Sequence, residues 1–219
     1  MVGAVTEAAR DAGARPGMRL TDARALDPGL VAVAADPVGD RALLDRLARW
    51  SSRWSPLVEV DGADALRLDA SGVAHLFGGE AALLRDIETR FATLGLTARV
   101  AMAGTAGAAW GLARYQPLSP LREREGPAKQ RASRSMDLLA PLPIAALRLP
   151  AAVVRTLDRL GLKTIGALVG VPRRSLARRF READNPLDAL DRMLGRTPEP
   201  LSATPVDPPP RALLRLAEP

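Results

Sequence analysis

Residues 56–80 read PLVEVDGADALRLDASGVAHLFGGE, and this stretch decides the fold of the first half of the chain. Two short runs, Leu57–Val60 and Ala65–Leu68, flank the pair Asp61-Gly62. The pair predicts a tight hairpin turn, because glycine tolerates the positive φ that such a turn requires. Side chains alternate along a strand, so Asp64 and Asp69 belong to opposite faces of the hairpin. A strand edged by carboxylates can be a metal platform or an ordinary half-solvated strand, and composition favours the ordinary strand.

Helical periodicity surrounds this hairpin. Residues 38–53 and 80–94 place apolar side chains at spacings of three and four, which predicts two helices with one buried face each. Short apolar runs predict strands at Leu30–Ala34 and Leu96–Met102, and Thr105 introduces a helix that ends at Tyr115. This order of elements favours an α+β fold, in which helices cover one face of an antiparallel sheet.

Two shorter helices are expected before the sheet. Residues 4–12 are followed by Gly13, which would end the first helix. Thr21 is a suitable cap for a second helix over Asp22–Leu26.

The second half of the chain is predicted to be helical. Residues 116–136 are polar, charged and contain proline, as in a linker. After them, Gly161 would close one helix, Thr164 would cap the next and Pro172 would start a third. A tether that contains four prolines follows Leu201.

Composition restricts the class of protein. The 219 residues include no cysteine, which excludes disulfides and thiolate metal sites and fits a reducing cytoplasm. No apolar run approaches the length of a bilayer span, and an N-terminus with Glu7 and Asp11 is no signal peptide.

Positive charge is concentrated in the second half. Residues 1–113 hold 12 Arg and Lys against 14 Asp and Glu, a balance of −2, whereas residues 114–219 hold 19 against 11, a balance of +8. The first half shares the abundance of arginine without the excess charge. A polyanion-binding surface therefore accounts for the asymmetry better than a compositional bias towards arginine does.

The hairpin region resembles the palm of Y-family (translesion) DNA polymerases, where Ser-Ile-Asp-Glu leads into Ala-Phe-Leu-Asp and Thr-Gly. Counting back from Gly72, Asp64 takes the position of the first Asp of this motif, and Ala65 stands where the family has Glu. The phrase LDASGVAHLFGGEAALL is closer still to the ImuB-type branch, whose members are thought to have lost catalysis.

Two further segments resemble parts of the same family. AARDAGARPGMRLTDARALDPGL resembles the fingers, so Arg10 matches the arginine that contacts the incoming triphosphate, although the Tyr position is Glu7. Arg10 can equally be a solvated helix residue. The loop AMAGTA places Thr105 and Ala106 where active relatives have Asn and a phosphate-binding Lys.

The segment LGLKTIGAL resembles the helix-hairpin-helix thumb of these polymerases, in which backbone N–H groups at a helix start hold a DNA phosphate. Arg148-Leu149-Pro150 replaces the family's Gly-x-Gly upstream. A helical bundle with a solvated basic face remains the alternative. The residues expected to contact DNA are Gly161, Lys163, Thr164, Gly166, Arg173, Arg174, Arg178 and Arg179.

The resemblance implies a division of the chain. The family's first palm strand, with its metal-binding Asp, would lie before Met1, so the sheet would keep an unpaired edge or a gap and helix surface would face water. We expect fingers at 1–34, a partial palm at 35–115, a linker at 116–136, a thumb at 137–205, and the start of a truncated little-finger domain at 206–219.

The function expected from this resemblance is that of a DNA-binding pseudo-polymerase adaptor in error-prone translesion synthesis. Two-metal phosphoryl transfer needs several converging carboxylates, and only Asp64 remains here. No cofactor is expected, and Mg²⁺ only in an active enzyme. The family implies an ImuA-type RecA-like protein, an error-prone DnaE-type polymerase and the sliding clamp as partners, in the cytoplasm at the nucleoid. Two alternatives stay open: an active Y-family polymerase with a mis-assigned start, and a stand-alone helix-hairpin-helix DNA-binding module.

Overall fold

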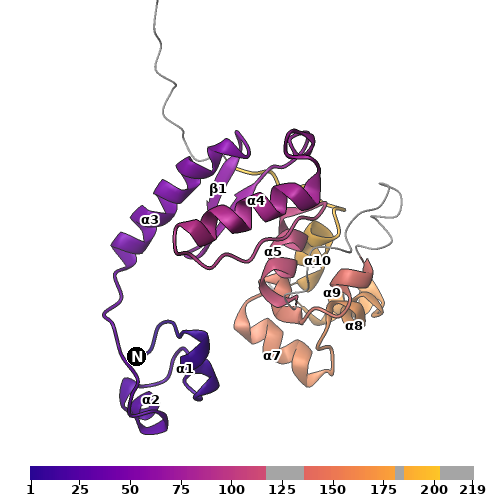
Figure 1. The fold of residues 1–219 in the computed structure, drawn as a ribbon. Coiled ribbons are helices and arrows are strands. Elements are labelled where there is room, and N and C mark those ends of the chain that lie inside the picture. Colours follow the sequence, from indigo (N-terminus) through magenta and orange to yellow (C-terminus); the bar gives the residue numbers. More distant parts are fainter. Residues whose placement is uncertain (117–135, 181–184, 203–219) are drawn as a thin grey trace, which may run out of the picture.

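The computed structural model describes residues 1–116, 136–180 and 185–202 (Figure 1). An antiparallel hairpin, β1 (Val58–Asp61) and β2 (Ala65–Leu68), lies against the helices α3 (Pro37–Trp50) and α4 (Glu80–Thr93). The predicted α+β class and the antiparallel sheet are confirmed. Within the described residues the sheet has two strands.

The hairpin turn forms at Asp61-Gly62 as predicted, and local signals also fix the ends of the neighbouring helices. Gly62 in its turn has φ 68°, and Gly95, two residues after α4, has φ 75°. Asp36 caps α3 by accepting a hydrogen bond from the Gly39 amide at 2.9 Å, and a 3₁₀ turn, η1 (Ser51–Arg53), extends this helix. Another 3₁₀ turn, η2 (Ala74–Phe77), connects the hairpin to α4.

Aromatic rings form the core between α3 and α4. Trp50 lies edge-on to Trp54 at 5.0 Å between ring centroids and edge-on to Phe91 at 5.4 Å. The Trp54 Nε1–H donates a 2.7 Å hydrogen bond to Asp86, and this bond is the main cause that lowers the pKa of the Asp86 carboxyl. Trp54 is therefore a core residue, and Trp50 packs against it.

Two predicted strands are wrong. Leu30–Ala34 and Leu96–Met102 have no regular secondary structure. A strand requires hydrogen-bonded neighbours, and in the described part of the chain neither segment has one. The apolar face of α4 is covered better than expected, since Leu83, Leu84 and Ile87 are buried despite the small sheet, whereas Leu43 of α3 is 37% exposed.

The N-terminal helices are α1 (Glu7–Asp11), capped by Thr6, and α2 (Leu20–Leu26). Thr21 does not cap α2, because that helix begins at Leu20, two residues earlier than expected, and Arg19 takes the cap position. Figure 1 shows both helices beyond the outer end of α3.

The C-terminal half is helical, as predicted. Its elements are η4 (Ile144–Leu147), α7 (Ala151–Arg159), α8 (Ile165–Val169), α9 (Arg173–Arg179) and α10 (Pro186–Met193). Thr164 caps α8 by accepting from the Ala167 amide at 3.2 Å, as predicted. The predicted linker lies almost wholly outside the described residues, and the tether from residue 203 onward lies outside them as well.

Helix α5 (Ala106–Tyr115), capped by Thr105, connects the two halves. Its residues Ala108 and Leu112 belong to the same core as Leu157, Ile165 and Leu168 of the C-terminal helices. The domain boundaries remain a prediction, but α5 packs with the helices that follow it. No helix in the described ranges is both long and apolar enough to cross a membrane.

Candidate functional site

A buried carboxylate joins the hairpin to the C-terminal helices. Asp61 ends β1 and is 7% exposed. The Arg148 guanidinium donates to both of its oxygens, Nη1 to Oδ2 at 2.6 Å and Nη2 to Oδ1 at 2.8 Å. This hydrogen bond is the main cause that raises the pKa of Arg148. Arg148 has a left-handed backbone with φ 58°, in the loop where the family has glycines, so the loop keeps a positive-φ residue without glycine.

Arg67 of β2 extends the network. Its guanidinium lies 3.0 Å from Glu59 on the neighbouring strand and 3.6 Å from Asp61. Its Nη1 donates to Glu199 at 3.0 Å, and Glu199 follows α10. The side chain is largely buried, so these contacts are shielded from water. The hairpin is therefore tied to the C-terminal helices at two places, by Arg148 and by Glu199.

The carboxylate that the palm motif predicts at a catalytic position is also paired. Asp64 lies in the hairpin turn, and Arg114 of α5 donates a 2.5 Å hydrogen bond to it. This bond is the main cause that raises the pKa of Arg114. The guanidinium groups of Arg114 and Arg148 lie 5.2 and 4.8 Å from the centroid of the Trp110 ring, close enough for cation–π contact.

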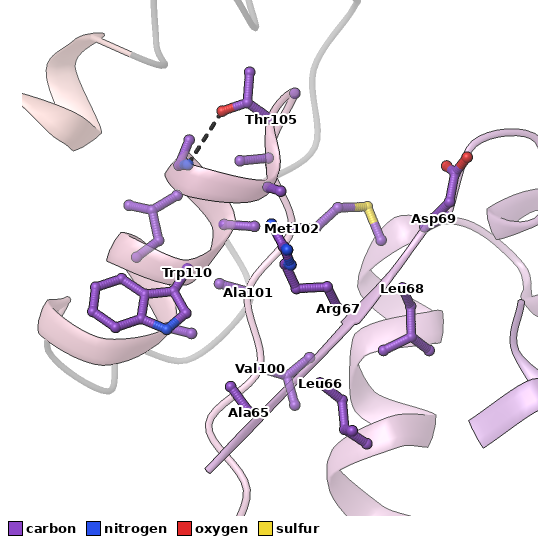
Figure 2. Close-up of a pocket in the computed structure, with 18 of the residues that line it drawn as sticks. Ala65, Leu66, Arg67, Leu68, Asp69, Val100, Ala101, Met102, Thr105 and Trp110 are labelled. Atoms are coloured by element: carbon purple, nitrogen blue, oxygen red, sulfur yellow. Dashed lines mark hydrogen bonds between the residues drawn. The ribbon is translucent and has the colours of Figure 1, made fainter. Parts of the chain in front are cut away.

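A groove of about 2640 Å³ runs beside β2, and Figure 2 shows Ala65, Arg67 and Asp69 of its wall. Asp64 and Arg10 also contribute to its lining. Asp64 and Ala65 adjoin at the start of β2, whereas Arg10 lies on α1 and, within the described residues, forms no hydrogen bond or ion pair with either of them. Two Mg²⁺ ions would need several carboxylates free to converge, whereas Asp61 and Asp64 are each held by an arginine and residue 65 has only a methyl group. Among the described residues no group of three or more Asp, Glu or His is arranged to hold a metal. These residues do not fit the metal pair of an active polymerase.

Two amides at the start of α8 are already engaged by backbone carbonyls. The N–H of Ile165 donates to the Leu142 carbonyl and that of Gly166 to the Ala140 carbonyl, both at 2.9 Å. A Cβ at Gly166 would meet the Cβ of Ala140 at 3.0 Å. Gly166 therefore allows close packing on Ala140, and its role in holding a phosphate stays a prediction. Gly161, with φ 78°, shapes the exposed turn between α7 and α8.

The basic residues around α9 fall into two groups. Arg173 donates two hydrogen bonds to Asp191 of α10, at 2.9 and 2.6 Å. Hydrogen bonding from Arg173 is the main reason why the pKa of the Asp191 carboxyl is lowered. The other group is exposed and has no ion pair within the described residues. Its members are Lys163, Arg174, Arg178 and Arg179.

The first half of the chain matches a known family. Residues 1–114 match the impB/mucB/samB family. The chain belongs to this family. Its similarity to Y-family DNA polymerases, inferred from the palm, fingers and thumb motifs, is thereby confirmed.

Curated relatives share the name Protein ImuB. In Caulobacter vibrioides strain NA1000 / CB15N, this protein is 46% identical over 187 residues, which cover 85% of the present impB/mucB/samB chain and 39% of the relative. Strain ATCC 19089 / CIP 103742 / CB 15 gives the same values. The chain therefore spans about two fifths of the length of these relatives.

Solved structures show the same fold. DinB from Sulfolobus solfataricus superimposes with a TM-score of 0.67 at 20% identity, covering 89% of this chain and 56% of that one. An insertion ternary complex of Dbh DNA polymerase gives a TM-score of 0.68 at 20% identity, covering 90% and 56%. At this identity the likeness concerns the fold alone.

Sequence reasoning missed the arginines of the network. Arg67, Arg114 and Arg148 belong to no motif that marks them as partners of the hairpin, although Arg148 stands at the replaced Gly-x-Gly. Arg114 and Arg148 lie 50 and 87 residues from the carboxylates they hold. No local pattern encodes contacts over such separations.

Proposed function

We propose that this chain is the DNA-binding part of an ImuB-type pseudo-polymerase, an adaptor in error-prone translesion synthesis after DNA damage. The observation that carries the proposal is the ion pair between Asp64 and Arg114 next to Ala65. Asp64, the one carboxylate expected at a catalytic position, is paired with the Arg114 guanidinium on the surface. The neighbouring position has no carboxylate to help bind Mg²⁺.

Primer extension with Mg²⁺ or Mn²⁺ tests the catalytic part. We expect no template-directed incorporation above background for the chain, either alone or as part of its full-length protein. The Asp64→Ala variant should give the same background. Incorporation that disappears in Asp64→Ala would establish an active polymerase instead.

The exposed cations of the C-terminal helices are the proposed DNA contacts. Lys163 precedes α8, and Arg174, Arg178 and Arg179 lie on α9. Since they have no ion pair among the described residues, binding to phosphates would release their counterions without breaking an ion pair in that part of the chain. Arg173 is not equivalent, since it is engaged by Asp191.

Binding to duplex DNA across a salt series tests this surface. The triple variant Lys163→Ala/Arg174→Ala/Arg178→Ala should bind more weakly and without change in sequence preference. Its log–log salt slope should decrease by up to about one unit for each lost phosphate contact.

A matched control removes the same charge elsewhere. Arg24, Arg46 and Arg49 are exposed on α2 and α3 and have no ion pair in the described part of the chain. The triple alanine variant at these positions should keep the parental slope. Equal slopes for both triple variants would mean that binding depends on net charge alone.

The partners are proposed from the family and not from a contact in this chain. They are an ImuA-type RecA-like protein, an error-prone DnaE-type polymerase and the sliding clamp, with location in the cytoplasm at the nucleoid. Co-purification of the full-length protein with each partner, repeated with the present chain alone, would show which of them this part binds.

A further inference from the structure

One carboxylate of α10 gathers two arginines from different parts of the C-terminal half. Arg173, the first residue of α9, donates from Nη1 to Oδ1 of Asp191 at 2.9 Å and from Nη2 to Oδ2 at 2.6 Å. Arg196, which follows α10, donates from Nη1 to the same Oδ1 at 3.2 Å. The two guanidinium groups therefore meet at one oxygen, where α9 and α10 are in contact (Figure 1).

The two arginines are accessible to solvent and the carboxylate is largely shielded. The side chains of Arg173 and Arg196 are 53% and 54% exposed, whereas the side chain of Asp191 is 15% exposed. The two cations together carry more charge than the single carboxylate neutralises. An anion in solution can therefore approach both guanidinium groups.

This arrangement has the chemistry of a phosphate site that is already occupied. An arginine binds a carboxylate and a phosphate through the same paired N–H···O hydrogen bonds. Two guanidinium groups close together repel each other unless an anion lies between them. Asp191 supplies that anion, so it lies where an oxygen of a bound phosphate would otherwise lie.

Arg173 also borders the proposed DNA surface. Successive residues of an α-helix are about 100° apart around its axis, so Arg174 and Arg178 share one face of α9 and Arg173 lies beside that face. Leu176, which is buried, lies on the opposite side of the helix. A phosphate bound at Arg173 would therefore extend the contacts proposed for Arg174 and Arg178.

We propose that Arg173 and Arg196 form a latent phosphate site that Asp191 keeps closed. This inference rests on the proposed DNA-binding surface of the C-terminal helices. The carboxylate belongs to the same chain, so it competes with a DNA phosphate at a high effective concentration. Asp191 thereby limits the affinity of the chain for duplex DNA, and binding depends on the neighbouring exposed cations.

Binding of Asp191→Asn to duplex DNA across a salt series tests the proposal. Asparagine keeps the shape of the side chain and removes its charge. The variant should bind more tightly than the parent, and its log–log salt slope should be steeper by up to about one unit for each freed arginine. It should also keep the circular dichroism of the parent, because half-exposed ion pairs contribute little to stability.

Asp188→Asn is the matched control. Asp188 lies about one turn before Asp191 on α10, is exposed and has no ion pair in the described part of the chain. This variant removes the same charge without freeing an arginine, so it should keep the parental slope. Equal slopes for Asp188→Asn and Asp191→Asn would overturn the proposal. Weaker binding of Asp191→Asn would overturn it as well, because Asp191 would then position α9 for DNA.

Two neighbouring arginines give a second measurement that does not depend on Asp191→Asn alone. In the parent, Arg173→Gln should leave the slope unchanged, whereas Arg174→Gln should lower it by up to about one unit. In the Asp191→Asn background, Arg173→Gln should lower the slope as well. An effect of Arg173→Gln that is the same in both backgrounds would contradict a closed site.

The same measurements separate the latent site from the DNA surface itself. A slope that falls in Arg174→Gln but does not rise in Asp191→Asn would refute the latent site and leave the surface in place. A parent without affinity for duplex DNA would refute the surface, and the latent site with it.

Discussion

Replacing Arg148 should destabilise the fold through the carboxylate it leaves behind. Asp61 is 7% exposed and receives two hydrogen bonds from Arg148, and its other cation, Arg67, lies 3.6 Å away. Arg148→Met keeps the apolar stem and removes the donors. The carboxylate then loses its charge-assisted partner in a site that water reaches poorly.

The expected loss is about 2 kcal/mol in the free energy of unfolding. Removing one partner of a fully buried ion pair costs about 3–5 kcal/mol. The Arg148 side chain is 40% exposed, so water enters on its side, and Arg67 compensates part of the charge. Both effects place the value nearer to that of a charge-assisted hydrogen bond, about 1.5–3 kcal/mol.

Urea unfolding of a double-mutant cycle measures this contribution. The cycle compares Arg148→Met, Asp61→Asn and the double variant, with the free energies taken from the unfolding midpoints at constant slope. Asp61→Asn should cost less, because the exposed guanidinium is solvated easily and asparagine still accepts a hydrogen bond. The coupling energy should be about 1–2 kcal/mol.

A control separates the ion pair from a general effect of losing an arginine. Arg155 is exposed on α7 and its guanidinium has no partner in the described residues, so Arg155→Met should change stability by less than about 0.5 kcal/mol. If Arg148→Met were no more destabilising than Arg155→Met, the bidentate pair would contribute nothing. The reasoning from burial would then be refuted.

Two further outcomes follow from close contacts. Gly166→Ala should lower the free energy of unfolding in urea by about 1–3 kcal/mol, because its Cβ would meet Ala140 at 3.0 Å. Gly170→Ala should be nearly neutral, because its Cβ would have no contact closer than 3.6 Å. Similar effects at both glycines would contradict the packing role of Gly166. The hydrogen bond from Trp54 is the main reason why the pKa of Asp86 is lowered. The ionised Asp86 should therefore stabilise the fold fully above the unfolded carboxyl pKa of about 4, and this contribution should be lost as the pH falls through the lower folded pKa. Asp86→Asn should therefore be less stable than the parent at neutral pH, with a difference that shrinks below about pH 4, and a pH-independent difference would contradict this.

The sequence by itself determined the features whose causes lie within a few residues. Asp61-Gly62 predicts the hairpin because the turn needs a positive φ that Gly62 supplies. Thr164 predicts the start of α8 because its hydroxyl reaches an amide three residues ahead. The apolar spacing of 80–94 predicts α4, because the helical repeat fixes which residues share a face.

Only the tertiary structure decided the features that depend on a distant partner. Leu96–Met102 has the composition of a strand, but a strand forms only where a neighbour supplies hydrogen bonds, and in the described chain none does. The palm motif predicts Asp64 as a metal ligand, but Asp64 forms an ion pair with Arg114, which lies 50 residues away in the sequence. Asp64 and Arg114 come together because α5 packs against the C-terminal helices. No local pattern in the sequence predicts that packing.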